Sequence, residues 1–341
     1  MTADSSVPQH DERFADDEAH HLRFLLRRMP SHRRIDKYLH GRLGDEFSRN
    51  ALQQLIRAGL VTVNGRPVKP SYSLNIGDTI DAILPPPTPD EVIPEPIPLN
   101  IIFEDQHLIV LNKPADLVVH PARGNQSGTL VNGLAYYSES LSSVSDGFRP
   151  GIVHRLDKNT TGVMAVAKTD MAHARIARQF EQRKVEKKYL AVVDGVVELH
   201  SDWIDLPVGR HPTVRERYAV RPADGRAART FYKVAQRLDG FTVLHLSPYT
   251  GRSHQLRVHM AHSGHPITGD TIYGGKAITT AILSRGEEIG SEPLIERQAL
   301  HAWSLTFRHP ESNEQMTFVA DPPDDLQHLI EELRRWRGTG G

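Results

Sequence analysis

The sequence predicts an α+β protein of two domains, and three observations lead to this prediction. In residues 34–84, two short helical patterns precede a hairpin signal and a further strand-like run. Residues 85–98 contain seven prolines, which force an extended backbone and cannot continue a helix or a central strand. Strand-like runs then dominate residues 186–260 and 298–320. We therefore expect a small αβ domain, an interdomain linker and a larger, strand-rich domain.

Composition restricts the class of protein. A chain of 341 residues is long enough for two or three domains with a hydrophobic core. The lack of Cys excludes disulfides, thiolate zinc sites and a catalytic thiol. No run approaches about 18 uninterrupted apolar residues, and the N-terminus has no basic-then-apolar signal pattern. We expect a cytoplasmic protein that does not associate with membranes.

The charges are unevenly distributed along the chain. The formal net charge of −1, from 41 basic and 42 acidic residues, argues mildly against a nucleic-acid partner. Acidic side chains, however, crowd the first twenty residues and the Pro-rich stretch: Asp4, Asp11, Glu12, Asp16, Asp17, Glu18, Asp90, Glu91 and Glu95. The remaining chain is correspondingly more basic. Residues 1–31 are polar and without periodicity, so we expect a mostly disordered extension there.

Each element of the small domain has its own signal. Residues 34–39 start a short helix, and Ser48 is a suitable N-cap for a second helix over residues 49–58, which Gly59 ends. Asn64-Gly65 separates two apolar runs and is a strong hairpin signal, because both turn positions need positive φ. A last strand is expected near residues 79–81.

The larger domain begins with strand-like runs at residues 101–103 and 108–111, followed by a helix near residues 129–141. Asp170 is expected to cap an amphipathic helix. Residues 187–193 form a predicted strand with Tyr189 at its entrance, and residues 324–337 form a C-terminal helix.

A polar dodecamer, residues 151–162, lies between apolar residues 152–153 and the buried-strand pattern of residues 164–168. A loop held between two core segments is where a rigid scaffold usually places catalytic side chains. We therefore interpret Asp157 as the centre of the chemistry. On spacing alone, a surface turn whose Asp caps a backbone group remains an equal alternative.

The dodecamer also carries a resemblance. His154-Arg155-Leu156-Asp157, followed by Lys158-Asn159-Thr160-Thr161-Gly162, resembles the active-site signature of the pseudouridine synthases that act on large-subunit ribosomal RNA. The resemblance covers about residues 34–310. It implies a catalytic domain over residues 99–337 with a mixed, largely antiparallel sheet. It also implies a monomeric enzyme that isomerises uridine in RNA without a cofactor or a metal.

Residues 34–84 are similar to the small RNA-binding domain shared by a small-subunit ribosomal protein, some tyrosyl-tRNA synthetases and many pseudouridine synthases. In that family the two-helix face contacts RNA phosphates, which position the substrate without reading its sequence. The resemblance makes five cations candidates for this role: Arg34, Lys37, Arg49, Arg57 and Lys69. For any single one, an ordinary solvated charge is the alternative.

The resemblance also assigns roles around Asp157, whose carboxylate would act as the nucleophile, on the base or on the sugar, or assist deprotonation at the sugar. Burial alone would neutralise this carboxyl group, so it needs a fixed cation nearby. Arg252, in the Thr-Gly-Arg-x-His-Gln motif, occupies the position that pairs with the catalytic Asp. Tyr189 resembles the Tyr that stacks on the everted base, and Arg155 the side chain that fills the vacated gap in the RNA.

Other functions fit the sequence less well. Four His side chains between residues 254 and 265 suggest a metal site, but His254 and His259 would point to opposite faces if they lie on a strand. No Gly-x-Ser-x-Gly motif of a hydrolase occurs. A non-catalytic RNA-binding or ribosome-assembly protein, and a synthase acting on transfer RNA, remain the alternatives. Residues 209–213, and His120-Pro121 followed by Gly124-Asn125, favour the subgroup that modifies a helical stem-loop of large-subunit ribosomal RNA.

Overall fold

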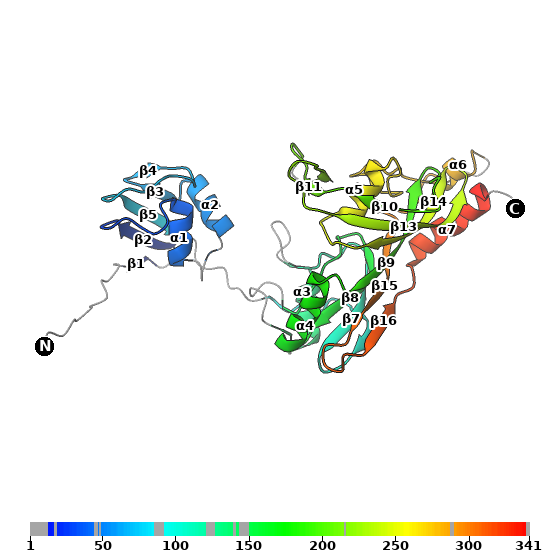
Figure 1. Cartoon of the computed structure of the whole chain (residues 1–341), viewed down its shortest axis with the longest axis horizontal. Coiled ribbons are helices and arrows are strands. Elements are labelled where there is room, and N and C mark those ends of the chain that lie inside the picture. Colours follow the sequence, from blue (N-terminus) through cyan, green and yellow to red (C-terminus); the bar gives the residue numbers. More distant parts are fainter. Residues whose placement is uncertain are drawn as a thin grey trace. The chain divides into compact units, whose positions relative to one another are not determined.

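The computed structural model describes residues 13–16, 19–43, 47, 49–84, 92–120, 127–138, 141–142, 150–214, 216–286 and 290–338. The chain forms two compact units, Met1–Asp90 and Glu91–Gly341 (Figure 1). No helix among these residues combines the length and the apolar character needed to cross a bilayer.

The N-terminal unit packs two helices, α1 (Ile35–Leu43) and α2 (Arg49–Arg57), against a five-stranded sheet. The strand order is β1-β2-β5-β3-β4, and every neighbouring pair is antiparallel. The strands are β1 (Arg13–Asp16), β2 (Ala19–Leu25), β3 (Val61–Val63), β4 (Arg66–Pro67) and β5 (Thr79–Leu84). Apolar side chains of both helices, including Leu39 and Leu52, form one buried cluster with those of the sheet. The two helices, the hairpin and the last strand are confirmed.

The hairpin has the geometry that its sequence predicts. Asn64 and Gly65 have φ values of 52° and 73°, and they join β3 to β4. The Asn64 side chain donates to Asp78 Oδ1 at 2.9 Å and accepts from the Thr79 amide at 2.9 Å, which ties the turn to the start of β5.

The expectation of an extension over residues 1–31 is wrong in its second half. Strand β2 pairs with β5 along its whole length, and Phe24 and Leu26 are buried in the core of the unit. The alternation of Leu22, Phe24 and Leu26 is a strand signal that the acidic composition of the neighbouring residues obscured. The proposed N-cap, Ser48, lies outside the described residues.

The second unit contains a nine-stranded sheet with the order β10-β13-β14-β9-β15-β8-β7-β6, and β16 pairs with β15. Only β15 and β8 run parallel among these neighbours, so the predicted mixed, largely antiparallel sheet is confirmed. The strands are β6 (Asn100–Glu104), β7 (Leu108–Lys113), β8 (Thr161–Ala167), β9 (Glu186–Asp194), β10 (Ser201–Asp205), β13 (Arg229–Leu238), β14 (Phe241–Pro248), β15 (Leu300–Arg308) and β16 (Gln315–Val319). A separate ribbon joins β11 (Val208–Arg210) and β12 (Tyr218–Val220).

The helices of this unit differ from the predictions in two places. Helix α3 (Leu130–Tyr137) and helix α7 (Asp324–Arg337) lie where they were expected. The N-cap of α4 (Asp170–Glu181) is Thr169, whose hydroxyl accepts from the Ala172 amide, and not Asp170. The segment expected to be a strand near residue 259 is helix α5 (Gln255–His262). The short helix α6 (Thr280–Leu283) follows it.

Strand β8 is buried along its whole length because helices cover both faces of the sheet around it. Val163 and Ala165 belong to a cluster with Ile176 of α4. Met164 and Val166 belong to a cluster with Leu130 and Leu134 of α3, on the other face. The loop that ends at β8 is therefore anchored to a strand that is buried on both faces.

The close packing of β8 against β15 makes a testable prediction. Gly162 has φ +117°, and an added Cβ would overlap the backbone of Ala302. We expect Gly162→Ala to lower the free energy of unfolding by about 2–4 kcal/mol, through overpacking and backbone strain together.

Gly240→Ala is the matched control, because Gly240 has φ +81° but open space around its Cα. It carries the backbone strain alone, and a loss of about 1–2 kcal/mol is expected. Urea unfolding of both variants measures the difference. Equal losses would contradict the close contact between β8 and β15.

Candidate active site

Asp157 lies in the loop that enters β8, and this loop is fastened at several points. Its first part is held by an isolated bridge between Ile152 and Val166. The amide of Thr160 donates to the Asp157 carbonyl at 3.1 Å, which closes a tight turn directly after Asp157. The backbone of Asp157 is therefore held in position by the sheet.

Lys113, at the end of β7, ties this loop to the neighbouring strand. Its ammonium is fully buried and donates to the carbonyls of Pro114, Leu117 and Lys158 at 2.7–2.8 Å. Burial lowers the pKa of Lys113 to about 7, and the negative charge of Asp157 opposes that decrease. A cation caged by three carbonyls stabilises one conformation of the loop.

The cation that pairs with Asp157 is Arg257, on the buried side of α5. Arg257 Nη1 lies 3.1 Å from Asp157 Oδ2. The same guanidinium makes a bidentate pair with Asp270, at 2.6 and 2.8 Å. The side chains of Arg257 and Asp270 are 5% and 1% exposed, whereas that of Asp157 is 20% exposed and faces the pocket. Burial alone would lower the pKa of Arg257, but the two carboxylates outweigh it and raise the pKa.

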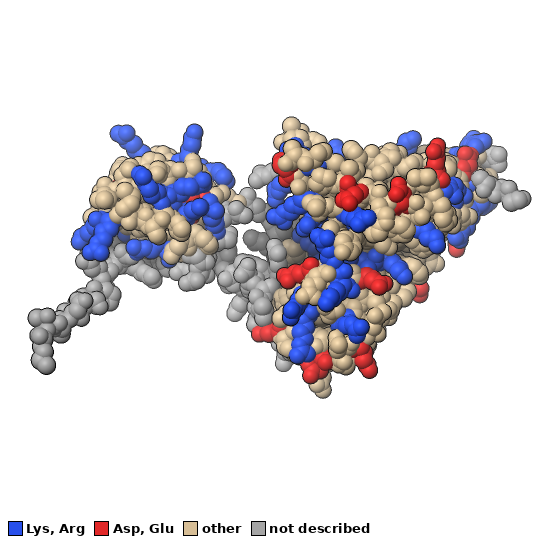
Figure 2. Space-filling view, in the orientation of Figure 1, with Lys and Arg blue, Asp and Glu red and all other residues tan. Residues whose placement is uncertain are grey.

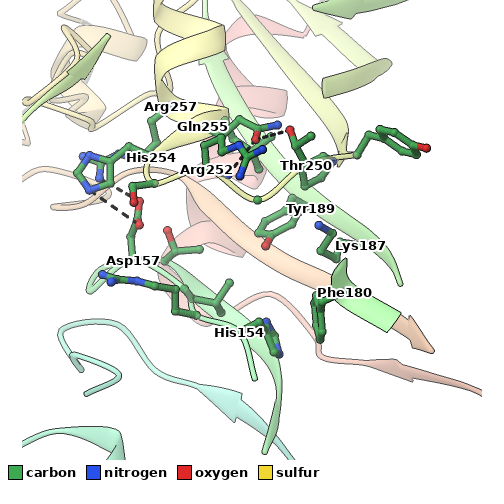
Figure 3. Close-up of a pocket in the computed structure, with 18 of the residues that line it drawn as sticks. His154, Asp157, Phe180, Lys187, Tyr189, Thr250, Arg252, His254, Gln255 and Arg257 are labelled. Atoms are coloured by element: carbon green, nitrogen blue, oxygen red, sulfur yellow. Dashed lines mark hydrogen bonds and ion pairs between the residues drawn. The ribbon is translucent and has the colours of Figure 1, made fainter. Parts of the chain in front are cut away.

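The prediction that Arg252 makes this pair is wrong in this structure. The Arg252 guanidinium donates to the Ala227 carbonyl at 3.1 Å, although the residue still lines the same pocket as Asp157. The Arg252 amide donates to Gln255 Oε1, so Arg252 precedes the helix, whereas Arg257 lies inside it and points at Asp157 (Figure 3). Spacing within the motif does not distinguish the two arginines.

His254 is the second neighbour of the carboxylate. It precedes α5 with φ 55°, and its Nε2 lies 3.9 Å from Asp157 Oδ1. Its Nδ1 hydrogen-bonds to the Tyr273 hydroxyl at 2.8 Å. Burial lowers the pKa of His254, against the opposing charge of Asp157, which favours the neutral imidazole. Arg257 is therefore the permanent positive charge beside Asp157.

The pocket has a volume of about 450 Å³ and is open on one side. Asp157, Tyr189, Arg155 and Arg252 all line it, so the four residues selected from the sequence meet at one site. Tyr189 extends from β9 toward the centre of the pocket (Figure 3). Burial, and then the charge of Asp157, raise the pKa of its hydroxyl, which keeps Tyr189 neutral.

His154 and Leu156, on either side of Arg155, pack against other side chains of the unit. The His154 ring stacks on Phe180 with centroids 4.6 Å apart, and its Nε2 accepts from the Ala165 amide at 3.0 Å. Burial lowers the pKa of His154 to about 3, so the ring is neutral. Leu156 is buried, while Arg155 between them is exposed at the pocket.

Several residues of the site were missed from the sequence. Buried Gln255 orders the loop before α5: it accepts from Thr250 at 2.7 Å and donates to the Arg229 carbonyl at 3.0 Å. Lys187 lies on β9 two positions before Tyr189 and lines the same pocket. The His-Gln pair of the motif signalled Gln255, whereas nothing local in the sequence marks Asp270 as the partner of Arg257.

The His residues considered for a metal make other contacts. His259 hydrogen-bonds to Thr230 and the Leu206 carbonyl, and His265 to the Asp194 carbonyl. The argument from a strand does not hold, because His259 and His262 are on a helix. In the part of the chain that the structure describes, no three His, Asp or Glu side chains form a group able to hold a metal ion.

Comparisons with known proteins identify the family of both units. Residues 107–262 match the RNA pseudouridylate synthase family, and residues 33–80 match the S4 domain. An RNA pseudouridine synthase of Bacillus subtilis is 41% identical over 302 residues, 89% of this chain and 94% of the relative. Ribosomal large subunit pseudouridine synthase D of Xanthomonas campestris is 42% identical over 309 residues, 89% of each chain. The structure of human RNA pseudouridylate synthase domain containing 1 aligns with a TM-score of 0.52 at 25% identity, covering 70% of this chain and 95% of the human one.

The fold, the pocket and the two family matches define the class of protein. It is an RNA-modifying enzyme whose S4 RNA-binding domain precedes the catalytic domain in the sequence. The chain belongs to the RNA pseudouridine synthase family, whose members are isomerases.

The pairing of Arg257 with two carboxylates predicts unequal roles for the two arginines of the motif. Arg257→Gln leaves buried Asp270 without its partner and should lower the free energy of unfolding by about 3–5 kcal/mol. Arg252→Gln removes a hydrogen bond to one carbonyl and should cost about 1 kcal/mol or less. Urea denaturation of the two variants tests this. A larger loss for Arg252→Gln would contradict the observed pairing.

Proposed function

We propose that this protein converts specific uridines of large-subunit ribosomal RNA to pseudouridine, with Asp157 as the nucleophile. The observation that carries the proposal is the pairing of Asp157 with Arg257 at the wall of a pocket that also contains Tyr189. The choice of RNA rests on the relatives named ribosomal large subunit pseudouridine synthase D.

The reaction breaks the bond between uracil and ribose, turns the base and joins it again through carbon. It needs no redox change and no energy source. It needs an ionised carboxylate in a pocket that excludes water. Arg257 places a fixed positive charge 3.1 Å from the Asp157 carboxylate, and buried Asp270 holds Arg257 in position.

A uridine stacked in folded RNA is out of reach of this pocket, so the nucleotide has to be everted. Tyr189 offers an aromatic face on which the uracil ring stacks. Arg155, exposed beside Asp157, takes the gap that the nucleotide leaves in the RNA, since its planar guanidinium stacks as a base does.

The S4 domain docks the RNA through its helices. Buried Asp36 accepts hydrogen bonds from Arg34 at 3.0 and 3.1 Å and from Arg49 at 2.7 and 3.1 Å. Burial alone would raise the pKa of Asp36, but these bonds and one from Gln53 lower it far below its usual value. The side chains of Arg34 and Arg49 remain 46% and 40% exposed, so Asp36 holds two cations in position for phosphates. Lys37, Arg57 and Lys69 are exposed, and Lys and Arg side chains spread over the face that carries α1 and α2 (Figure 2).

The enzyme works in the cytoplasm as a monomer, without a cofactor.

Asp157→Asn tests the chemistry. The amide keeps the shape of the side chain but loses the nucleophile, so pseudouridine formation should fall by more than about 10⁴-fold. RNA affinity should stay within about threefold, because docking uses the S4 cations.

The measurement is pseudouridine mapping in ribosomal RNA of cells with the wild-type protein, with Asp157→Asn and with neither. Loss of the same sites in the last two cells supports the proposal. An unchanged map favours a non-catalytic RNA-binding or assembly protein, and sites lost only from transfer RNA would redirect the substrate.

Three exposed cations of the S4 domain test the docking. Combined Lys37→Gln, Arg57→Gln and Lys69→Gln should weaken RNA binding and reduce the slope of log Kd against log salt concentration by about 2–3. The matched control is the triple change Arg285→Gln, Arg334→Gln and Arg335→Gln, which removes three exposed cations outside the pocket. An equal effect of both triples on Kd would contradict docking by the S4 domain.

A further inference from the structure

Lys187 is a cation in the pocket, and none of the residues that the structure describes forms an ion pair with it. It lies two positions before Tyr189 on β9, so both side chains emerge on the same face of the strand and both line the pocket. Among the described residues, its ammonium makes no hydrogen bond and no ion pair with a carboxylate. Burial lowers the pKa of Lys187 to about 8. A charge that loses water without gaining a partner is unfavourable in the free protein, so its partner has to arrive with the substrate.

The position of Lys187 limits what that partner is. Figure 3 shows Tyr189 in the middle of the pocket, with Asp157 on one side of it and Lys187 with Phe180 on the other. When the sugar carbon C1′ lies at Asp157 and the uracil ring lies on Tyr189, the far edge of the ring, with the carbonyl oxygen on C4, extends toward Lys187. The surrounding His154 and Phe180 offer no competing charge, because the imidazole is neutral.

The reaction generates a negative charge on the uracil ring. Asp157 forms a bond from a carboxylate oxygen to C1′, and the bond from C1′ to N1 breaks with its electron pair leaving on the base. The detached uracil is an anion whose charge is shared between N1 and the two carbonyl oxygens. The base turns, C5 forms the new bond to C1′, and the carboxylate leaves with its own electron pair. The proton on C5 is then lost and N1 is protonated, so the product is an isomer of the substrate.

We propose that Lys187 binds the carbonyl oxygens of the detached uracil anion and holds it in the pocket while it turns. The inference rests on the proposed function. It gives Lys187 a role in the chemical step, because the anion exists only after the glycosidic bond breaks. A flexible ammonium suits a base that changes orientation, since it donates three hydrogen bonds without the fixed plane of a guanidinium.

Other charged and titratable groups line the same pocket, and their titrations have to be separated from that of Lys187 in a pH profile. Besides Lys187, they are His154, Arg155, Asp157, Glu181, Arg183, Tyr189, Tyr249, Arg252, His254 and Arg257. Arg257 remains charged, and the pKa of Tyr189 is raised beyond the range of the assay. The pKa of His254 is lowered, so its titration falls at acidic pH. Loss of the Lys187 proton, as pH rises through about 8, predicts an alkaline decrease in kcat/KM. Lys113, whose pKa is about 7, holds the loop of Asp157 and titrates in the same region, so only the part of the decrease that Lys187→Arg moves to higher pH is assigned to Lys187.

The experiment compares the full-length wild type with Lys187→Met, Lys187→Arg and the control Lys188→Met. Lys188 is exposed and lies on the other face of β9. The probe is protein-free large-subunit ribosomal RNA from cells that lack this synthase, with tritium at C5 of its uridines. Lys187→Met should lower the single-turnover rate of tritium release by about 100-fold, with RNA Kd within threefold. Lys187→Arg should stay within tenfold of wild type and shift the alkaline decrease to higher pH, and Lys188→Met should match wild type.

Stability separates this role from a structural one. Removal of a partly buried charge that has no partner among the described residues should leave the Tm of Lys187→Met equal to or above that of wild type. A lowered Tm with weakened RNA binding would assign Lys187 to the fold, and a raised Kd with an unchanged rate would make it a phosphate contact. Either result overturns the inference, as does a rate within threefold of wild type. Tritium release by wild type in the same assay tests the proposed function separately, because its absence would overturn that function itself.

Discussion

One arginine joins the reactive carboxylate of this protein to its scaffold. Arg257 contacts Asp157 on one side and the buried Asp270 on the other, so a carboxylate that is 20% exposed is held by a cation whose own position is fixed. Without Asp270, Arg257 and Asp157 could change position together as a pair. Anchoring through Asp270 supplies the preorganisation that an active site needs, because the charge is in position before the substrate binds.

The sheet positions the other residues of the pocket. Asp157 precedes β8, which is packed by α3 on one face and α4 on the other, while Arg257 comes from α5. Tyr189 lies on β9, separated from β8 by β15 alone. Lys113 fastens the loop from the side of β7. Residues far apart in the sequence therefore meet at one pocket, because β7, β8 and β9 lie close together in the sheet and α5 lies beside them.

The sequence predicted what depends on local patterns. Alternating apolar residues, Asn64-Gly65 and the periodicity of residues 324–337 determine elements by their own chemistry, and the structure contains them. Side-chain pairing is different, because it depends on how α5 is placed against the loop of residues 151–162. Two arginines five residues apart are equally suitable cations in the sequence, and only the helical turn directs Arg257 to Asp157. Lys187 likewise becomes informative only when the structure leaves it without a partner.

A crystal structure of the wild-type protein bound to a ribosomal RNA stem-loop tests this account most directly. The RNA should carry 5-fluorouridine at a mapped site, because fluorine at C5 blocks the final proton loss and retains the nucleotide. The account predicts an everted base on Tyr189, with C1′ at the carboxylate of Asp157 and the pair between Asp157 and Arg257 intact. A nucleotide that remains stacked in the RNA, or an Asp157 that has left Arg257 to pair with Arg252, would contradict it.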